Sequence, residues 1–430
     1  MRKTAAVMTL VSALLFSTLS GPMRISLGTA NPVPSPDEWP TFHQNPAHEG
    51  YVTGTAPTTS FTQLWKFPTG SPAYSSPSYV NGVVYAASHN GVIYAINAST
   101  GIKIWNTTTP DLISYSAPTY SSGRLYVGRN LLYCLNASTG SQIWNSTVGS
   151  SSSAVDFVRF VYVVSGEIVY CFDKETGEEE WRSQIGPVGF SSPAIDLGLL
   201  YVGSYDGNIY ALDALTGATV WNYTTGDSVE SSPSVAGGYV YVGSNDMNIY
   251  AINASTGHKA WSYKTGSFVY SSPAVFNGSV YVGSNDGNVY SLNASTGKRI
   301  WSYQTGYAVY SSPAVAGDCI YVGSGYPSAH FSGDSVYALD ASSGNKIWSF
   351  QTGGPVESSP AVANGYLYVG SEDGNVYALR VSQSTTANHP PEPFPFVPVA
   401  IGVAVVAVSV IAGLLLYFKK RTGQTPASKN

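Results

Sequence analysis

The chain has 430 residues, only 10% of them are charged, and the formal net charge is -5. A chain of this length contains either several domains or one repeat fold, and an internal repeat in the sequence distinguishes the two. So few basic residues provide no surface that could neutralise nucleic-acid phosphates, and we expect no nucleic-acid partner.

The amino terminus has the layout of a secretory signal. Arg2 and Lys3 precede an apolar run that extends to about Leu19, and a basic segment followed by an apolar one directs secretion. The sequence therefore predicts a signal peptide over residues 1–30, followed by a lead-in segment over residues 31–60.

Tryptophan recurs at a nearly constant interval. Successive members of the series are 40, 39, 37, 40, 40, 40 and 47 residues apart, and a period near 40 indicates a propeller or another repeat array. The eight residues are Trp65, Trp105, Trp144, Trp181, Trp221, Trp261, Trp301 and Trp348. Residues 270–306 form one whole unit, which Gly, Asn and Asp turn signals divide into four short β-rich stretches. Each unit is predicted to be a four-stranded sheet.

The four predicted strands of the unit are SSPAV (strand A), VYVGS (strand B), NVYSLN (strand C) and KRIWSY (strand D). The small residues of strand A suit the crowded axis of a ring, and the Trp of strand D suits the wide gap between diverging blades. The proline of strand A has no N–H group, which a sheet tolerates on an edge strand. We expect strand A to be such an edge.

The two ends of the repeat region are predicted to meet in one blade. Strand A occurs eight times, starting at Ser75, Ser116, Ser152, Ser191, Ser231, Ser271, Ser311 and Ser358. The last unit ends at Arg380 after strand C, and residues 61–67 can supply its missing strand D. This closure removes the exposed edges of an open array. The predicted fold over residues 61–380 is an all-β, eight-bladed β-propeller closed by an N-terminal strand.

A proline-rich segment and an apolar segment follow the repeats. Residues 381–395 are predicted to form an extended stalk. Residues 396–418 are nearly uncharged and long enough for a helix to cross a hydrocarbon core about 30 Å thick, so we expect a transmembrane helix, with a buried core helix as the alternative. Residues 419–430 begin with three basic residues, which favour the cytoplasmic side. The chain is thus predicted to be a single-pass membrane protein with its propeller outside the cell.

The cysteines and the Asp-Gly-Asn turns are interpreted as structural. Cys134 and Cys171 occupy the same position in neighbouring repeats, so we expect small buried residues and no disulfide framework. Asp206, Asp286 and Asp373 each bring one carboxylate to a tight turn, whereas a calcium loop needs several oxygen ligands. No metal site is predicted.

The blades resemble the repeat of the pyrroloquinoline-quinone-like (PQQ-like) propeller family. The resemblance rests on Tyr-Val-Gly-Ser, Gly-Asn-Val-Tyr-Ala-Leu, Ala-Ser-Thr-Gly and Ile-Trp over residues 38–380, and residues 39–42 resemble the family's N-terminal segment. Members include quinoprotein alcohol dehydrogenases and the non-enzymatic propeller of the outer-membrane barrel assembly machinery. The resemblance therefore implies the fold and leaves the function open.

The enzymes of this family resemble one another in an adjacent Cys-Cys pair, calcium-binding Glu, Asn and Asp residues, and a catalytic Asp. This chain has no adjacent cysteines. PQQ is a tricarboxylate that needs cationic partners, yet none of the residues directly before the strands A that are candidates for the channel mouth is basic. Haem-attachment, zinc-protease and nucleophile-elbow motifs are also missing from the sequence. We expect no cofactor and propose no catalytic residue, and PQQ with calcium is the alternative.

The residues directly before strand A are the main binding candidates. In propellers the D–A and B–C loops emerge on one face, so these side chains are predicted to surround the mouth of the central channel, the default binding site. They are Tyr74, Tyr115, Phe190, Glu230, Tyr270, Tyr310 and Glu357. Aromatic rings with two carboxylates suit a sugar, a cation or a basic peptide. The alternative is that they fill the funnel and pack on neighbouring blades.

An insertion and a set of sequons give further candidates. The B–C loop of the seventh blade is lengthened, and its contact candidates are Tyr326, His330, Phe331 and Asp334, with a tolerated surface loop as the alternative. Eight Asn-x-Ser/Thr sequons occur, four of them in C–D turns where Asp serves the same role in other repeats. The glycosylation candidates are the other four, Asn106, Asn145, Asn222 and Asn277.

The sequence predicts a membrane-anchored extracellular propeller that binds or scaffolds a protein or glycan partner. One alternative is a membrane-tethered, PQQ-dependent quinoprotein dehydrogenase, against which the missing Cys-Cys pair and basic residues argue. Another is an envelope assembly subunit like the propeller of the barrel assembly machinery, which would normally carry a lipid anchor.

Overall fold

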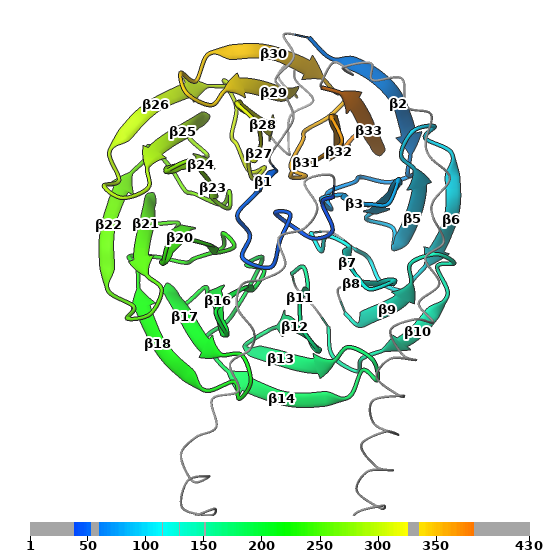
Figure 1. Ribbon diagram of the computed structural model, residues 1–430, viewed down its shortest axis with the longest axis horizontal. Helices are drawn as coiled ribbons and strands as arrows, with labels where there is room; N and C mark the ends of the chain where they lie inside the picture. Colours follow the sequence, from blue (N-terminus) through cyan, green and yellow to red (C-terminus); the bar gives the residue numbers. More distant parts are fainter. Residues whose placement is uncertain are drawn as a thin grey trace, which may run out of the picture. The chain divides into compact units, whose positions relative to one another are not determined.

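The computed structural model describes residues 38–52, 60–113, 115–128, 130–149, 152–325 and 335–381. Their strands form eight separate sheets arranged in a ring around one axis (Figure 1). The prediction of an all-β, eight-bladed propeller is confirmed. The segments predicted to be a signal peptide, a transmembrane helix and a cytoplasmic tail lie outside the described residues. Within those residues, there is no helix with the length and apolarity that a membrane crossing requires.

Each blade places four antiparallel strands side by side from the axis to the rim. Strands A line the axis: β3 (Ser78–Val80), β7 (Thr119–Ser121), β11 (Val155–Phe157), β15 (Ala194–Asp196), β19 (Ser234–Ala236), β23 (Ala274–Phe276), β27 (Ala314–Ala316) and β31 (Ala361–Ala363). Strands B follow: β4 (Val83–Ala87), β8 (Arg124–Gly128), β12 (Phe160–Ser165), β16 (Leu199–Gly203), β20 (Tyr239–Gly243), β24 (Ser279–Gly283), β28 (Cys319–Ser324) and β32 (Tyr366–Ser371). Strands C are β5 (Val92–Asn97), β9 (Leu132–Asn136), β13 (Ile168–Asp173), β17 (Asn208–Asp213), β21 (Asn248–Asn253), β25 (Asn288–Asn293), β29 (Ser335–Asp340) and β33 (Asn375–Arg380). Strands D form the rim: β6 (Lys103–Thr108), β10 (Gln142–Asn145), β14 (Glu179–Gln184), β18 (Thr219–Thr224), β22 (Lys259–Lys264), β26 (Arg299–Gln304), β30 (Lys346–Gln351) and β2 (Thr62–Pro68).

The ring closes as predicted, by pairing the two ends of the repeat region. Strand β2 lies antiparallel to β33, and the pairing runs from Thr62 with Arg380 to Pro68 with Asn375. Figure 1 shows the blue β2 on the outer side of the orange β33. The propeller also includes Val381, which is buried and whose N–H donates to the Gly365 carbonyl. The stalk predicted over residues 381–395 otherwise lies outside the described residues.

Strand A is shorter than predicted. In the sixth blade the strand covers only Ala274–Phe276, and Ser271, Ser272 and Pro273 precede it. Proline has no N–H group to donate. The N–H of Ser272 donates to a serine hydroxyl of the next blade. Pairing with strand B therefore begins only after the proline, and the preceding serines contact the neighbouring blade.

Strand A was predicted to be the inner edge strand of each sheet, and the structure shows that the lead-in covers most of these edges. We call residues 38–52 the axial plug. Its carbonyl groups accept hydrogen bonds of 2.7–2.9 Å from the N–H groups of the middle residue in six strands, namely Tyr79, Tyr120, Ile195, Val235, Val275 and Val315. The plug ends in β1 (Tyr51–Val52), which pairs parallel with β27.

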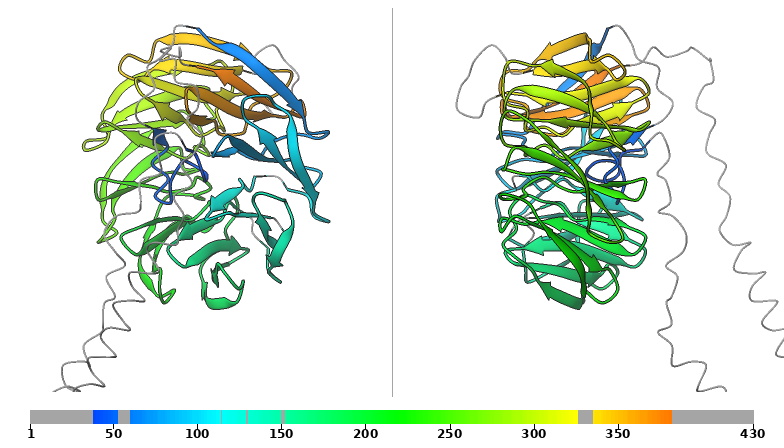
Figure 2. Two further views of the ribbon diagram at one scale, coloured as in Figure 1. Left: turned by 45° about the vertical axis from the view of Figure 1, so that its right-hand side comes forward. Right: turned by 90° about the vertical axis from the view of Figure 1, so that its left-hand side faces the viewer.

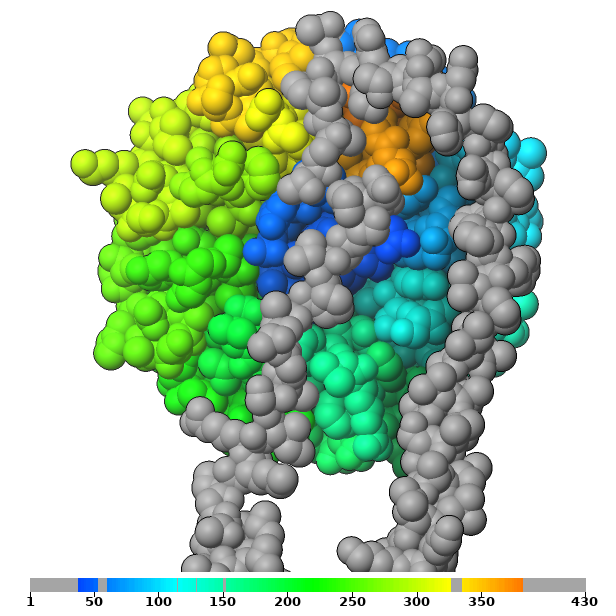
Figure 3. Space-filling view, in the orientation of Figure 1, coloured from blue at the N-terminus to red at the C-terminus, as the bar shows by residue number. Residues whose placement is uncertain are grey.

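The axial plug lies toward one face of the ring. Figure 2 shows the ring edge-on with the blue segment nearer one side, and Figure 3 shows the same blue residues filling the centre of the face viewed. At its start, Trp39 is 2% exposed and pairs with Tyr79 of β3. The plug therefore satisfies the inner edges and closes one end of the axis.

Neighbouring blades are joined by the strand D tryptophans, as predicted. The indole N–H of Trp261 donates to the Ala294 carbonyl of the next blade at 2.8 Å, and a Cβ built on Gly297 would lie 2.7 Å from the Trp261 ring. Six other tryptophans make the same bond at 2.8–3.2 Å. Trp348 differs because the last blade, built from both ends of the chain, has no continuous C–D turn. There the ring of Phe61 packs 4.8 Å from Trp348.

The turns and cysteines also follow the sequence analysis. The carboxylate of Asp286 accepts hydrogen bonds from the N–H of Asn288, the hydroxyl of Tyr290 and the N–H of Gly266 at 2.7–2.9 Å. This set of internal donors supports its interpretation as a hairpin residue. Cys134 and Cys171 are buried, unpaired and on separate sheets, as predicted.

Candidate axial binding site

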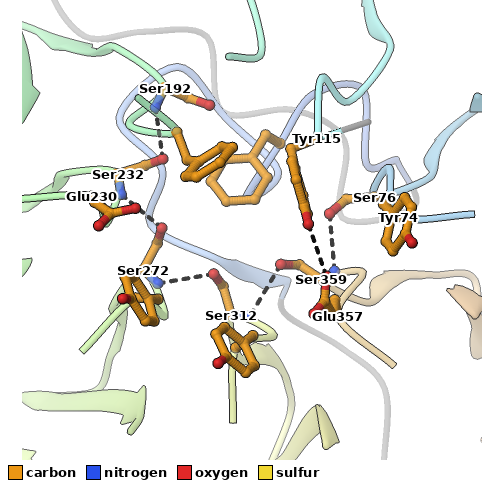
Figure 4. A pocket seen from close by; sticks show the side chains of 14 residues that line it. Tyr74, Ser76, Tyr115, Ser192, Glu230, Ser232, Ser272, Ser312, Glu357 and Ser359 are labelled. Atoms are coloured by element: carbon orange, nitrogen blue, oxygen red, sulfur yellow. Dashed lines mark hydrogen bonds between the residues drawn. The ribbon is translucent and has the colours of Figure 1, made fainter. Parts of the chain in front are cut away.

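All seven side chains predicted to surround the channel mouth line one cavity of about 330 Å³ (Figure 4). Each of these residues directly precedes the segment that leads into strand A. Because they share one position in the repeat, they form one layer around the axis. The remaining lining residues are Phe42, Ser76, Ser192, Ser232, Ser272, Ser312 and Ser359. The cavity thus has an aromatic and acidic rim, an inner layer of serines, and one side chain from the axial plug.

The inner serines belong to a circle of hydrogen bonds that joins the blades. The N–H of Ser232 donates to Oγ of Ser272 at 2.9 Å, and the N–H of Ser272 donates to Oγ of Ser312 at 2.9 Å, as the dashed lines in Figure 4 show. Seven such bonds of 2.8–3.0 Å link consecutive blades and finish at Ser76. The second blade has Ala117 at this position, so Ser76 meets no serine hydroxyl at the eighth junction. The sequence predicted small residues near the axis but not these bonds.

The aromatic rim residues form two groups. Tyr270 and Tyr310 are stacked, with ring centroids 5.4 Å apart and planes 12° apart. On the other side, Tyr115 packs against Tyr74 at 5.5 Å and edge-on against Phe190 at 4.9 Å. The alternative that these residues pack on neighbouring blades is therefore true in part, yet the contacts leave an open cavity between the groups.

The two glutamates give the cavity its charge. Oε2 of Glu357 accepts a hydrogen bond from the Tyr115 hydroxyl at 3.1 Å, and Oε1 of Glu230 accepts one from the Asn245 amide at 2.7 Å. Burial raises the pKa of both carboxyls, and these hydrogen bonds oppose the rise. Burial, and then the charge of Glu357, raise the pKa of the Tyr115 hydroxyl. The cavity therefore concentrates negative charge in a partly desolvated site.

The axial plug contributes a lining residue that the sequence analysis missed. Phe42 reaches the cavity and stacks on His43 at 4.5 Å. His43 and His48 are buried, and Nδ1 of His48 lies 3.1 Å from the Pro233 carbonyl. Burial lowers the pKa of His43 to about 4 and that of His48 to about 3, so both are neutral near pH 7. The only sequence feature that pointed to Phe42 was the resemblance of residues 39–42 to the N-terminal segment of the family. That resemblance does not indicate where the segment lies in the fold.

The other predicted sites lie away from the cavity or outside the described residues. Tyr326, His330, Phe331 and Asp334 of the insertion belong to the undescribed residues 326–334. The glycosylation candidates Asn106, Asn145, Asn222 and Asn277 are all exposed, and their modification stays a prediction. In the C–D turn of the sixth blade, Oδ1 of Asn293 accepts hydrogen bonds from the N–H groups of Ser295 and Thr296, which agrees with the turn role assigned to this group of sequons.

The cavity does not fit the PQQ cofactor of the family's dehydrogenases. PQQ carries three carboxylates, whereas the cavity presents two of its own, and none of the described residues that line it is Lys, Arg or His. None of these described lining residues is a cysteine either. Within the described residues, no three His, Cys, Asp or Glu side chains gather in a way that could hold a metal ion such as calcium. The described lining is therefore not complementary to the charge of PQQ.

The fold and the cavity define an eight-bladed propeller with a cavity on its axis. The sequence matches the family described as outer membrane protein assembly factor BamB over residues 58–165, 164–304 and 268–413, and the chain belongs to this PQQ-like β-propeller family. Among curated proteins, no match to the chain was found.

Solved structures share the fold at low sequence identity. BamB from Moraxella catarrhalis is 22% identical with a TM-score of 0.64, over 75% of this chain and 100% of that chain. Quinohemoprotein alcohol dehydrogenase from Comamonas testosteroni is 16% identical with a TM-score of 0.68, over 83% of this chain and 82% of that chain. A europium-containing methanol dehydrogenase is 14% identical with a TM-score of 0.69, over 81% of this chain and 99% of that chain. These likenesses concern the fold alone, and the function has to be argued from the cavity.

Proposed function

We propose that this chain is a recognition propeller that binds or scaffolds a protein or glycan partner through its cavity-bearing face. The observation that carries the proposal is the cavity of about 330 Å³, lined by aromatic, acidic and hydroxyl side chains from seven blades and by Phe42. Convergent polar groups in an apolar-walled concavity are typical of a binding site. The closed circle of blades holds these groups in place, which reduces the ordering cost of binding.

The setting that we propose is the outer side of a membrane. The secretory signal predicted over residues 1–30 and the transmembrane helix predicted over residues 396–418 support an anchored propeller with a short cytoplasmic tail. In that setting, exposed sequons such as Asn106 and Asn222 would lie in the compartment where N-glycans occur.

The family match favours a second candidate, an assembly subunit of the cell envelope. The matched family is described as an outer membrane protein assembly factor, and the match extends from residue 58 to residue 413. Such a role uses the same binding logic, because an assembly subunit also acts by holding a partner. The charge of the cavity argues against the dehydrogenase alternative, since the described lining residues include none of the cationic groups that PQQ needs.

Photo-crosslinking from the full chain in cells tests the proposed function. A benzophenone amino acid, which reacts with C–H bonds of proteins and glycans alike, replaces Tyr310 at the cavity mouth. The control position is Leu197, which is 81% exposed in the A–B turn between β15 and β16, at the opposite end of the blade. The proposal expects a discrete crosslinked species from the first position only. Equal labelling from both positions, or none from Tyr310, would contradict it.

A further inference from the structure

We propose that the axial cavity binds an organic cation that carries an alkylammonium group. This inference rests on the recognition function proposed above and assigns the chemistry of the ligand. It is carried by two features that come from different residues, the unpaired negative charge of the cavity and the arrangement of its aromatic rings.

The negative charge of the cavity has no counterion within the described part of the chain. Glu230 and Glu357 take no part in the ion pairs found there, which involve other carboxylates. Their hydrogen-bond donors, the Asn245 amide and the hydroxyls of Tyr115 and Tyr205, are neutral groups. Burying a carboxylate without a cation is unfavourable, and a bound cation would remove that cost. The cavity is therefore complementary to positive charge.

The aromatic rings favour an organic cation over a hydrated metal ion. Five rings stand in two groups on the rim, and Glu230 and Glu357 come from blades that separate these groups in the ring. Cations are attracted to the faces of aromatic rings, and quaternary ammonium ligands are recognised in this way. Tyr115 and Phe190 are 43% and 47% exposed, so a ligand can reach them. A calcium ion instead needs six or more oxygen ligands.

The size and the serine layer restrict the ligand further. A volume of about 330 Å³ lies near the lower limit of ligand pockets and admits a headgroup or a single side chain. The hydroxyl oxygen of each of the six lining serines accepts a hydrogen bond from a backbone N–H group of the preceding blade. These bonds hold the hydroxyl oxygens in a rigid layer at the base of the cavity. An anion would meet both glutamates. An alkylammonium group, free or at the end of a lysine side chain, satisfies all of these constraints.

Calorimetric titration of the full chain in detergent tests the proposal with three probes. Choline represents a free ammonium compound, a lysine blocked at its amino and carboxyl groups represents the side chain of a protein partner, and 3,3-dimethylbutan-1-ol is the neutral isostere of choline. We expect at least one of the two cations to bind, and the neutral alcohol to bind about tenfold more weakly or worse. Tighter binding of choline identifies a small molecule as the ligand, and tighter binding of the blocked lysine identifies a protein side chain.

Charge-neutralising variants locate the binding. Glu230→Gln and Glu357→Gln keep an oxygen that accepts the bonds from Asn245 and Tyr115, and each should weaken cation binding about tenfold. Glu178→Gln is the matched control, because Glu178 is exposed in the loop before β14 and the variant changes the net charge equally. It should bind the cation within about twofold of the parent chain. Circular dichroism melts check that each variant is folded.

The outcomes separate the two proposals. If the neutral alcohol binds as well as choline, or if both glutamine variants bind like the parent chain, cation recognition is wrong. The same holds if neither cation binds while the Tyr310 position still gives a crosslinked species, and in each of these cases the recognition function survives. If the cations do not bind and the Tyr310 position gives no crosslink, both proposals fail.

Discussion

The two ends of the propeller axis start from the same eight strand A segments and are finished in different ways. At one end the carbonyl groups of the axial plug accept hydrogen bonds from six strand edges, and Trp39 of the plug is buried. At the other end the residues before strand A are Tyr in four blades, Glu in two and Phe in one, and a cavity stays between them. Unpaired backbone edges must be covered, whereas loop side chains carry no such requirement. The residues at the plugged end therefore contribute to the stability of the propeller, whereas the side chains at the open mouth can be selected for binding.

The largest expected effect comes from removing the anchor of the plugged end. Trp39 is 2% exposed, so Trp39→Ala should lower the free energy of unfolding by about 3–5 kcal/mol. Urea denaturation of the full chain measures the change. Leu197→Ala, at a residue 81% exposed, is the control and should change stability by less than about 0.5 kcal/mol. A loss for Trp39→Ala no greater than that of the control would show that the plug is not part of the stable core.

Acid should weaken the plugged end next. His43 and His48 have pKa values of about 4 and about 3 in the folded chain, whereas an unfolded histidine titrates near pH 6.5. Below about pH 6.5 the unfolded chain binds more protons, so the free energy of unfolding falls with decreasing pH, by up to about 1.4 kcal/mol per pH unit for each histidine. Glu49 offsets part of this loss, because burial raises the pKa of its carboxyl.

Urea titrations at a series of pH values measure this dependence. The loss should begin below about pH 6.5 and continue to about pH 4 for His43. A chain with His43→Gln and His48→Gln should show a flatter profile over the same range, at whatever stability it retains. A profile of the parent chain that is already flat there would contradict the burial of two neutral histidines.

The serine circle between the two ends should have a smaller effect. Ser272→Ala removes the hydroxyl that accepts the Ser232 N–H at 2.9 Å, and leaving a buried N–H unpaired costs about 1–3 kcal/mol. Ala117→Ser restores the missing hydroxyl at the eighth junction and should stabilise the chain by about 0.5–1.5 kcal/mol. Thermal melts compare both variants with the parent chain. Equal effects of the same sign would mean that the circle does not act through these bonds.

At the open mouth the expected change in stability is the smallest and has the opposite sign. Burial raises the pKa of Glu357, which means that folding disfavours its charged form. Glu357→Gln should therefore raise the free energy of unfolding at pH 7 slightly, within about 1 kcal/mol. Urea denaturation at pH 7, with Glu178→Gln as the control, measures the difference. A clear loss of stability would assign Glu357 to the structural framework instead of the binding mouth.

The sequence predicted the repeat architecture because each blade carries its own local signals. The strand D tryptophans, the Gly-containing turns and the unpaired FTQLWKF segment were sufficient to predict eight blades and their closure through β2 and β33. The length of strand A could not be predicted from such local signals. Its serines bond to the next blade, and that partner lies about 40 residues away in the sequence.

The candidate site was predicted for the residues that belong to the repeat and missed for those that do not. The seven channel-mouth residues, from Tyr74 in the first blade to Glu357 in the last, occupy the same position in their repeats. The geometry of a closed ring therefore predicts that they lie together. Phe42 lies outside the repeats, and no periodic signal connects it with the axis. The burial of His43 and His48 was missed for the same reason, since a segment without a repeat partner has no register from which to derive its place.

We propose that the axial cavity recognises a ligand and does not hold a redox cofactor. The most direct test is a thermal melt of the full chain with and without PQQ plus calcium, compared with calcium alone. A ligand at 100 times its dissociation constant adds about 2.7 kcal/mol of stability, which a melt detects readily. We predict an unchanged midpoint at saturating cofactor, because the described residues that line the cavity include two glutamates and no basic side chain. A clear rise beyond calcium alone would contradict the claim and make this propeller a quinoprotein.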